Sequence, residues 1–251
     1  MSDKMEVYYF SPTGGTKKVS DIFAAAVGKD VVWHDLGDKQ KPTTKQPQGE
    51  LIVVAAPVFA GRIPSVVREK IKTLAGEGKQ AVTIAVYGNR AYEDALLEMN
   101  DILIQGGFTV IASAAFVAQH SIVPEVGAGR PDVEDIKEIR IFAEAVKNSA
   151  SAENVQVPGN RPYKPEMKVA AAPLSLPSCT ACRACAKICP TDAISNEEGK
   201  MATDAAKCIL CMACIHACPK QARILPLPLQ QKTDNMLAAF KDVRNKNEVF
   251  F

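Results

Sequence analysis

All eight cysteines of the chain lie between Cys179 and Cys218, and none occurs in the first 178 of its 251 residues. Four of them follow the pattern C-x2-C-x2-C-x3-C-P, and the same pattern recurs 29 residues later. The first copy contains Cys179, Cys182, Cys185 and Cys189, and the second contains Cys208, Cys211, Cys214 and Cys218. A secreted disulfide scaffold would distribute its cysteines over the whole fold, so this clustering indicates metal ligation.

The spacing within each copy is typical of iron–sulfur ligation. Three closely spaced thiolates can surround one cubane cluster from a tight loop, and the fourth cysteine of this motif ligates the other cluster. We therefore expect two [4Fe–4S] clusters. Cys179, Cys182, Cys185 and Cys218 would hold one, and Cys208, Cys211, Cys214 and Cys189 the other. The alternative is zinc, but zinc sites usually combine two cysteine pairs across a long gap. His216 also has no neighbouring histidine with which to complete a zinc set.

The segment from about Leu176 to Ile224 resembles the bacterial ferredoxins with two [4Fe–4S] clusters. All eight ligand positions match, and so do Pro190 and Pro219, which follow the fourth cysteine of each copy. The resemblance implies a small α+β ferredoxin-like domain that transfers one electron per cluster at low potential.

Strand-like and helix-like segments alternate in the first 150 residues. Continuous apolar runs predict parallel strands that are buried on both faces. These runs are 7–10, 31–33, 51–56, 81–87 and 108–116, and the helix-like segments between and after them are 15–27, 64–74, 92–105 and 132–147. The alternation predicts an α/β fold with a doubly wound, five-stranded parallel sheet.

The turn after the first predicted strand has the composition of an anion-binding loop. It consists of Ser11, Pro12, Thr13, Gly14, Gly15 and Thr16. Glycines allow a phosphate to approach the backbone closely, and the free N–H groups of the following helix point at it. The turn lacks the Gly-Lys-Ser/Thr ending of an NTPase loop and the G-x-G-x-x-G pattern of a dinucleotide site. Taken alone, it also fits an ordinary turn that caps a helix.

Two further loops are expected at the same edge, because ligands of doubly wound sheets bind at the carboxyl ends of the strands. One contains Pro57, Val58, Phe59, Ala60 and Gly61, and the other contains Tyr87, Gly88, Asn89, Arg90, Tyr92 and Asp94. Aromatic side chains such as Phe59 and Tyr92 can stack on a planar ring. The three loops together predict a site for a ring that carries one terminal phosphate.

The first 150 residues resemble flavodoxin in the phosphate turn (Ser11, Thr13, Gly14 and Thr16) and in the loop at 88–93. The resemblance implies the strand order 2-1-3-4-5 and non-covalent FMN, with Phe59 and Tyr92 beside the isoalloxazine. It also implies that Gly61, or the Ala60–Gly61 peptide, turns a carbonyl toward the reduced flavin, since glycine makes such a rearrangement cheap.

The whole arrangement resembles the flavodoxin–ferredoxin fusion proteins of anaerobes. We expect an FMN-binding domain at 1–150, a proline-rich connector at 151–175 and a two-cluster ferredoxin domain at 176–225. A C-terminal tail with a short helix would follow at 226–251, with its last residues packed onto a domain.

This organisation predicts an electron-transfer iron–sulfur flavoprotein of anaerobic metabolism, a carrier of the oxidoreductase type. It would convert between the two-electron steps of FMN and the one-electron steps of the clusters. The alternative is a ferredoxin-type flavin reductase that acts on a small organic substrate bound over the FMN. Arg62, Arg90 or His120 would then position that substrate, although His120 also fits an ordinary loop histidine. No residue is assigned a catalytic role.

The expected partner is a redox protein or a small-molecule electron acceptor, with a homodimer as one option. The net charge of +2 predicts no strong attraction to nucleic acid or to a membrane surface. The longest apolar run, 51–60, is too short to cross a bilayer, and the N-terminus lacks the pattern of a signal peptide. We therefore expect a cytoplasmic protein.

Overall fold

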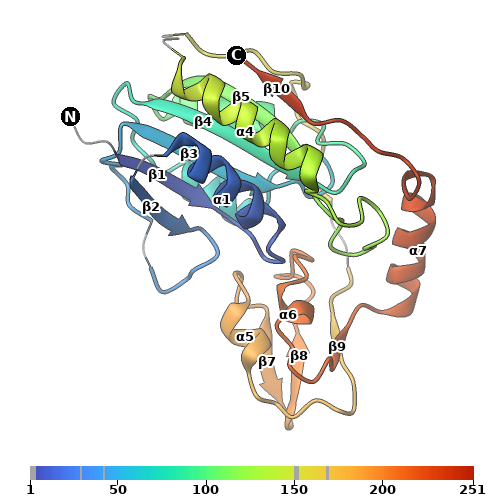
Figure 1. Cartoon of the computed structure of the whole chain (residues 1–251). Helices are drawn as coiled ribbons and strands as arrows, with labels where there is room; N and C mark the ends of the chain where they lie inside the picture. Colours follow the sequence, from blue (N-terminus) through green and yellow to red (C-terminus); the bar gives the residue numbers. More distant parts are fainter. Residues whose placement is uncertain (1–3, 29, 42, 150–152, 168–169) are drawn as a thin grey trace.

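The structure is a computed structural model that describes residues 4–28, 30–41, 43–149, 153–167 and 170–251. Most of its strands form a six-stranded sheet with the order β10-β5-β4-β3-β1-β2 (Figure 1). Five of these strands are parallel: β1 (Lys4–Tyr9), β2 (Asp30–Asp35), β3 (Leu51–Pro57), β4 (Gln80–Tyr87) and β5 (Thr109–Val117). They confirm the five predicted strands and the order 2-1-3-4-5.

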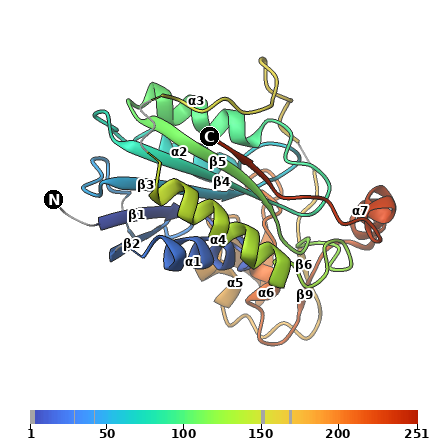
Figure 2. The ribbon, with the colours of Figure 1, turned by 45° about the horizontal axis from the view of Figure 1, so that its top comes forward.

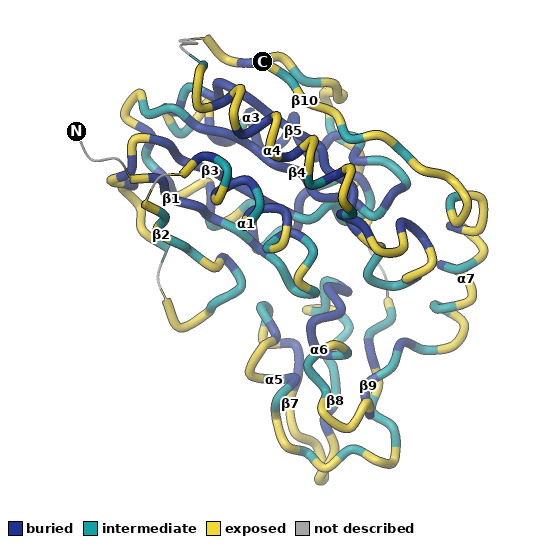
Figure 3. Tube along the Cα trace, in the orientation of Figure 1, coloured by how far each residue is buried: buried dark blue, intermediate teal, exposed yellow. Residues whose placement is uncertain are grey.

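Helices cover both faces of this sheet. α1 (Gly15–Val27) and α4 (Val133–Lys147) pack on one face, and α2 (Ser65–Ile71) and α3 (Ala95–Gln105) on the other (Figure 2). The interior strands are buried along almost their whole length (Figure 3). This double burial explains why their sequences are continuously apolar rather than alternating.

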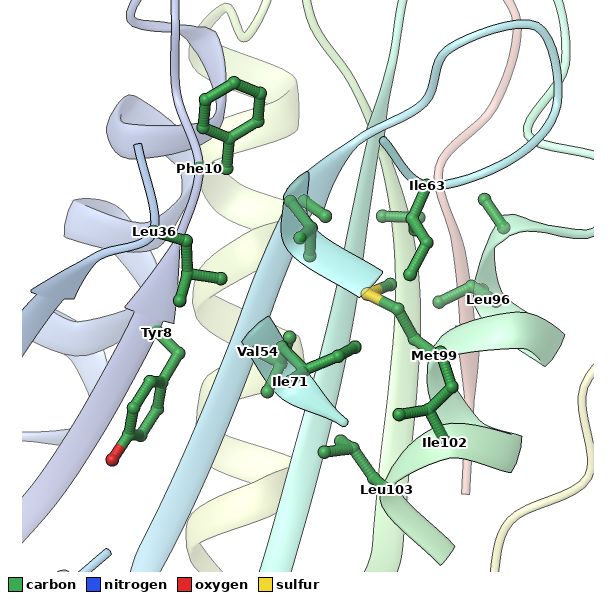
Figure 4. Close-up of a cluster of buried hydrophobic side chains, with 14 of the residues drawn as sticks. Tyr8, Phe10, Leu36, Val54, Ile63, Ile71, Leu96, Met99, Ile102 and Leu103 are labelled. Carbon is green, nitrogen blue, oxygen red and sulfur yellow. The ribbon is translucent and has the colours of Figure 1, made fainter. Parts of the chain in front are cut away.

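Each face of the sheet has its own apolar core. On the α2/α3 face, Ile71 lies beside Val54, and Leu96 and Met99 project from α3 into the same cluster (Figure 4). Burying each such side chain contributes about 1.5–3 kcal/mol. The two cores hold the parallel strands in register and so place their carboxyl ends side by side.

The outer edge of β5 is covered by β10 (Glu248–Phe250), which the sequence did not predict. β10 runs antiparallel to β5, with Val249 opposite Ala114, and Phe251 packs on Phe142 at a ring distance of 5.5 Å. A three-residue strand is too short to show a periodicity of its own. The tail therefore lies on the sheet, and it removes an edge that would otherwise be free to pair.

The cysteine-rich part is a small α+β unit. Its strands form two antiparallel pairs, β6 with β9 and β7 with β8, and two short helices lie beside them. In chain order the elements are β6 (Leu174–Ser175), α5 (Ala184–Ile188), β7 (Ile194–Glu197), β8 (Lys200–Thr203), α6 (Ala213–His216) and β9 (Arg223–Ile224). α7 (Leu227–Leu237) and the 3-10 turn η1 (Ala238–Phe240) follow and lead the chain back to the sheet.

The connector is bound to the sheet domain over much of its described length. The Val155 amide donates to the Val110 carbonyl at 2.8 Å, and the hydroxyl of Tyr163 donates to Asp101 at 2.5 Å. Asp94 accepts from the backbone amides of Asn160 and Lys164 at 2.9 and 2.6 Å. Among the described residues, no helix has the length and apolar character that a membrane span requires.

Candidate cofactor sites

A cavity of about 420 Å³ lies at the carboxyl ends of the parallel strands, where the cysteine-rich unit meets the sheet. It brings the three predicted loops together. The predicted residues that line it are Ser11, Pro12, Thr13, Gly15, Thr16, Pro57, Val58, Phe59, Ala60, Gly61, Tyr87, Gly88 and Arg90. Its walls are completed by the loop after β5, by residues 209–211 of the cysteine-rich unit and by α7.

Four predicted residues lie outside the lining and support it instead. Gly14 is the N-cap of α1, with φ of +91°. Asn89 is fully buried against the tail, and Asp94 holds the connector. Tyr92, which we expected beside the ring, packs edge-on against Tyr87 and donates its hydroxyl to Glu248 at 2.5 Å. The tyrosine of this loop that lines the cavity is therefore Tyr87.

The phosphate turn presents free donors to the cavity. No side chain caps the N-terminus of α1, and its first turn carries no acidic residue. Ser11 braces the turn by accepting from the Lys17 amide at 2.8 Å. The backbone amides of Gly15 and Thr16 find no acceptor among the described residues. Unpaired amides at the start of a helix form a site that suits an anion.

The loop after β3 ends in a tight turn. Phe59 and Arg62 exchange backbone hydrogen bonds at 2.9 and 3.2 Å, and the two residues between them have positive φ, 52° at Ala60 and 89° at Gly61. The Gly61 carbonyl accepts from the Asp94 amide at 2.9 Å, so it is already engaged. Arg62 points away from the cavity lining and forms a bidentate pair with the buried Glu98. It is therefore not placed to position a substrate.

His120 lines the cavity from the loop after β5. Its Nδ1 accepts from the backbone amides of Ile122 and Val123 at 3.2 and 3.1 Å, so the neutral ring carries its proton on Nε2. Burial, and secondarily the charge of Arg90, lowers the pKa of His120 to about 4. The ring packs tightly on Gly88, where a Cβ would lie 2.3 Å from His120 Cδ2. At neutral pH His120 is thus a fixed, uncharged hydrogen-bond donor.

This lowered pKa makes a testable prediction about stability. The unfolded chain takes up a proton on this histidine below about pH 6.5, whereas the folded chain does so only near pH 4, so stability falls as the pH drops between these values. Between pH 7 and 4.5 the wild type should lose about 2–3 kcal/mol more unfolding free energy than a His120→Asn variant, whose amide oxygen can still accept both backbone bonds. Urea denaturation at the two pH values measures this difference, and equal losses in the two proteins would contradict it.

The C-terminal segment is locked onto the loop after β4 by buried polar contacts. Asn89 Nδ2 donates to the Val243 carbonyl at 2.6 Å, and Asn89 Oδ1 accepts from the Asn245 amide at 3.1 Å. Arg130, which is paired with Asp135, donates to the Asn245 carbonyl at 2.7 Å. The segment after α7 is thereby fixed to the sheet domain, and α7 is held beside the cavity.

Sequence reasoning missed the contribution of this segment to the cavity. The α7 residues concerned are Leu229, Lys232, Thr233, Met236 and Leu237. Leu237 is buried with Val123 and Val126 of the loop after β5, which anchors the helix. Nothing in the sequence around α7 indicates that it returns to the first domain, so no sequence signal could have assigned these residues.

The eight cysteines surround two small cavities, four around each. One cavity is lined by Cys179, Cys182, Cys185 and Cys218, and the other by Cys189, Cys208, Cys211 and Cys214. These are the two groups of four that the motif predicts, with the fourth cysteine of each copy exchanged. Among the described residues, no three His, Cys, Asp or Glu side chains are grouped to hold a single metal ion.

The sequence repeat is also a repeat of backbone conformation. Three positions in each copy have positive φ, and the equivalent positions agree within a few degrees. The pairs are Ala181 (51°) with Leu210 (53°), Arg183 (63°) with Met212 (65°), and Asp192 (52°) with Gln221 (49°). Positive φ is unfavourable for these residue types, so its recurrence indicates a constraint that both loops share.

Backbone amides point at cysteine sulfurs in both copies. The Ala193 amide donates to Cys189 Sγ at 3.3 Å, and the Ala222 amide donates to Cys218 Sγ at 3.2 Å. Such bonds favour thiolate over thiol. Cys211 is the opposite case, because burial raises its pKa to about 12. Its sulfur therefore stays protonated until a metal replaces the proton.

Cys211 connects the two kinds of site. It lines the large cavity at the sheet, and it is also one of the four cysteines around the second small cavity. Ile209 and Leu210 line both cavities as well. The cavity of Cys189, Cys208, Cys211 and Cys214, the proximal site, thus adjoins the sheet cavity. The other, the distal site, does not share a lining residue with it.

Comparison with known proteins assigns the cysteine-rich unit. Residues 178–223 match the family described as the 4Fe-4S dicluster domain. No curated protein matches the chain. Solved structures similar to the sheet domain include a flavodoxin from the domain Archaea, with 16% identity and a TM-score of 0.41 over 57% of this chain and 96% of that one.

Two further solved structures cover the same part of the chain. A Streptococcus pneumonia TIGR4 flavodoxin has 21% identity and a TM-score of 0.42 over 56% of this chain and 95% of that one. A short-chain flavodoxin associated with a non-canonical PDU bacterial microcompartment has 17% identity and a TM-score of 0.45, over 59% and 99%. The topology itself rests on the strand order, which is that of the flavodoxin-like fold. The chain thus joins a domain of flavodoxin-like topology to a 4Fe-4S dicluster domain.

Proposed function

We propose that the protein transfers electrons between FMN in the sheet cavity and two [4Fe–4S] clusters, one in each four-cysteine cavity. FMN can take up two electrons and release them one at a time, and each cluster exchanges one, so the chain would connect two-electron with one-electron reactions. The observation that carries this proposal is the position of Cys211, which lines both the sheet cavity and the proximal site.

The sheet cavity suits FMN at both ends of that molecule. The uncapped amides of Gly15 and Thr16 would bind the phosphate, and Ser11 and Thr13 also line the cavity. Phe59 offers aromatic surface for the ring, and Tyr87 contributes to the lining while its ring packs on Tyr92. Because the Gly61 carbonyl is already bonded to Asp94, the carbonyl that remains available to the flavin on this turn is that of Ala60.

The size and cover of the cavity favour an electron carrier over a reductase. At about 420 Å³ it lies in the lower part of the range of roughly 300–1,000 Å³ for pockets that hold one small ligand. α7 and residues 209–211 form part of its lining. A bound FMN would therefore face the proximal site rather than a second open chamber for a substrate.

The distal site offers a route to an external partner. Cys182 is exposed, whereas Cys211 and Cys214 are buried. We place the exchange with a redox protein or a small-molecule acceptor at this exposed end. In functional terms we divide the chain as 1–150 for FMN, 151–175 as connector and 176–225 for the clusters. The segment 226–251 then completes the FMN site.

An anaerobic reductive titration of the reconstituted protein tests the proposal. Complete reduction should take roughly four electrons per chain, two for FMN and one for each cluster. Visible absorbance follows the flavin and EPR follows the clusters. Uptake of roughly two electrons would mean that either the flavin or the clusters are absent and would contradict the proposal. Steady turnover of an added organic compound would instead favour the reductase.

A further inference from the structure

One ring nitrogen of His120 is a hydrogen-bond donor without an acceptor in the wall of the sheet cavity. Nδ1 accepts from the backbone amides of Ile122 and Val123, which leaves Nε2 as the nitrogen that carries the proton. Among the described residues Nε2 has no acceptor, and the protein does not fully enclose it. Because His120 lines the cavity, this N–H is available to a ligand that binds there.

The loop that carries His120 holds this donor in place. The His120 amide donates to the Val126 carbonyl at 3.0 Å. Val126 is fully buried, in a cluster with Val123 and Leu237. On the side of the loop after β4 the ring packs on Gly88, where a Cβ would lie 2.3 Å from the ring Cδ2. A donor that is already fixed loses little conformational entropy when a ligand binds, and this favours affinity.

The same loop adjoins the phosphate turn. A Cβ placed on Gly15 would lie 3.3 Å from the Cβ of Ala118, so the start of α1 packs against a residue only two positions before His120. The uncapped amides of Gly15 and Thr16 and the N–H of His120 thus open on one cavity from two neighbouring segments. A phosphate group can accept several hydrogen bonds at once, and bonds to a charged acceptor are stronger than neutral ones.

The charges of the cavity wall also favour an anion. Arg90 and Lys232 are the only charged side chains in the described lining, and both are positive. Arg90 is paired with Glu93 at 2.9 Å, whereas Lys232 has no ion pair or hydrogen bond with another described residue. Since no described carboxylate lines the cavity, its field attracts the negatively charged end of a ligand.

We propose that the Nε2–H of His120 donates to the phosphate of FMN and, together with the amides of Gly15 and Thr16, makes the site selective for the phosphorylated flavin over riboflavin. This inference rests on the proposed function and adds the residue that recognises the phosphate from the side opposite the helix. His120 is then a specificity-determining residue, since riboflavin offers the same ring but leaves the donor without a charged acceptor.

Binding of the two flavins to the full-length, cluster-loaded chain tests this proposal. In His120→Asn the shorter side chain can still accept both backbone bonds, but its amide does not reach the position of Nε2. The Kd for FMN should rise by about tenfold or more, the loss expected for one hydrogen bond to a charged group, while the Kd for riboflavin stays within about twofold of the wild-type value. Flavin fluorescence measures both constants. The phosphorus NMR signal of bound FMN should also shift in this variant.

A Phe59→Leu variant is the matched control, because it alters the surface offered to the ring. It should weaken the binding of both flavins by similar factors and leave the phosphorus signal unchanged. A wild type that binds no FMN would refute the proposed function itself. If the wild type binds FMN, equal losses of FMN and riboflavin affinity in His120→Asn would overturn only the phosphate contact, and so would an unchanged affinity for FMN. Where riboflavin binds too weakly for a Kd, an unshifted phosphorus signal overturns it.

Discussion

A chain with Cys211→Ala is expected to bind about half the iron of the wild type and to lose electron exchange between flavin and clusters. Each [4Fe–4S] cluster is held by four thiolates, so removing one should reduce the iron content from roughly eight to roughly four atoms per chain. Cys211 also forms the wall between the sheet cavity and the proximal site. Without the proximal cluster, the remaining one lies in a cavity that does not adjoin the flavin site.

A matched variant separates this effect from simple cluster loss. Cys182→Ala also removes one ligand of four, but at the distal site. Its iron content should fall by the same amount, while exchange between the flavin and the proximal cluster persists. Laser-flash reduction under anaerobic conditions, followed at the flavin and cluster absorbance bands, measures the exchange. If both variants retained it equally, the electron path through the proximal site would be wrong.

The second large effect is expected at the buried ion pair of Arg130 and Asp135. Their side chains are 5% and 1% exposed, and two hydrogen bonds join them. An Arg130→Met variant leaves the buried carboxylate without its bidentate partner and with only the more distant guanidinium of Arg244, at 3.6 Å, which should lower the unfolding free energy by about 3 kcal/mol. It also removes donors to Asn89 and to the Asn245 carbonyl, so β10 should loosen from the sheet. Urea denaturation and amide hydrogen exchange measure the two effects.

Arg244 provides the control, because it lies on the same tail segment but is 46% exposed, pairs mainly with Asp132 and reaches Asp135 only at 3.6 Å. Arg244→Met should cost only about 0–1 kcal/mol, as exposed ion pairs do. A double variant that also carries Asp135→Leu should recover much of the stability lost in Arg130→Met, since both buried charges are then gone. Similar costs for the two arginine variants would show that the buried pair does not anchor the tail.

Local sequence patterns were sufficient to predict several features of the structure. Uninterrupted apolar runs predicted the parallel strands, because strands covered on both faces have no polar side to alternate with. The strict 29-residue offset predicted the two groups of four cysteines, since the fourth ligand of each motif belongs to the other cluster. In both cases the physical cause acts within a short stretch of chain.

Contacts between segments that are far apart in the sequence could not be predicted from local patterns. Tyr92 has the composition and position of a stacking residue, yet Glu248, 156 residues later, binds its hydroxyl beside Tyr87. Asn89 follows a strand like a loop residue, but the tail buries it completely. α7 lines the cavity because the C-terminal segment that follows it is bound to the sheet domain. No local pattern encodes which partner a polar side chain meets across such separations.

The sequence by itself determined the kinds of site this protein carries: a phosphate turn before a helix, and two interleaved sets of four thiolates. Only the tertiary structure decided how they are joined. It brings Cys211 and α7 into the wall of the sheet cavity and leaves Cys182 exposed. The physical reason is range, because ligand spacing and strand burial act over a few residues, whereas the packing of one domain on another is set by surfaces that many segments share.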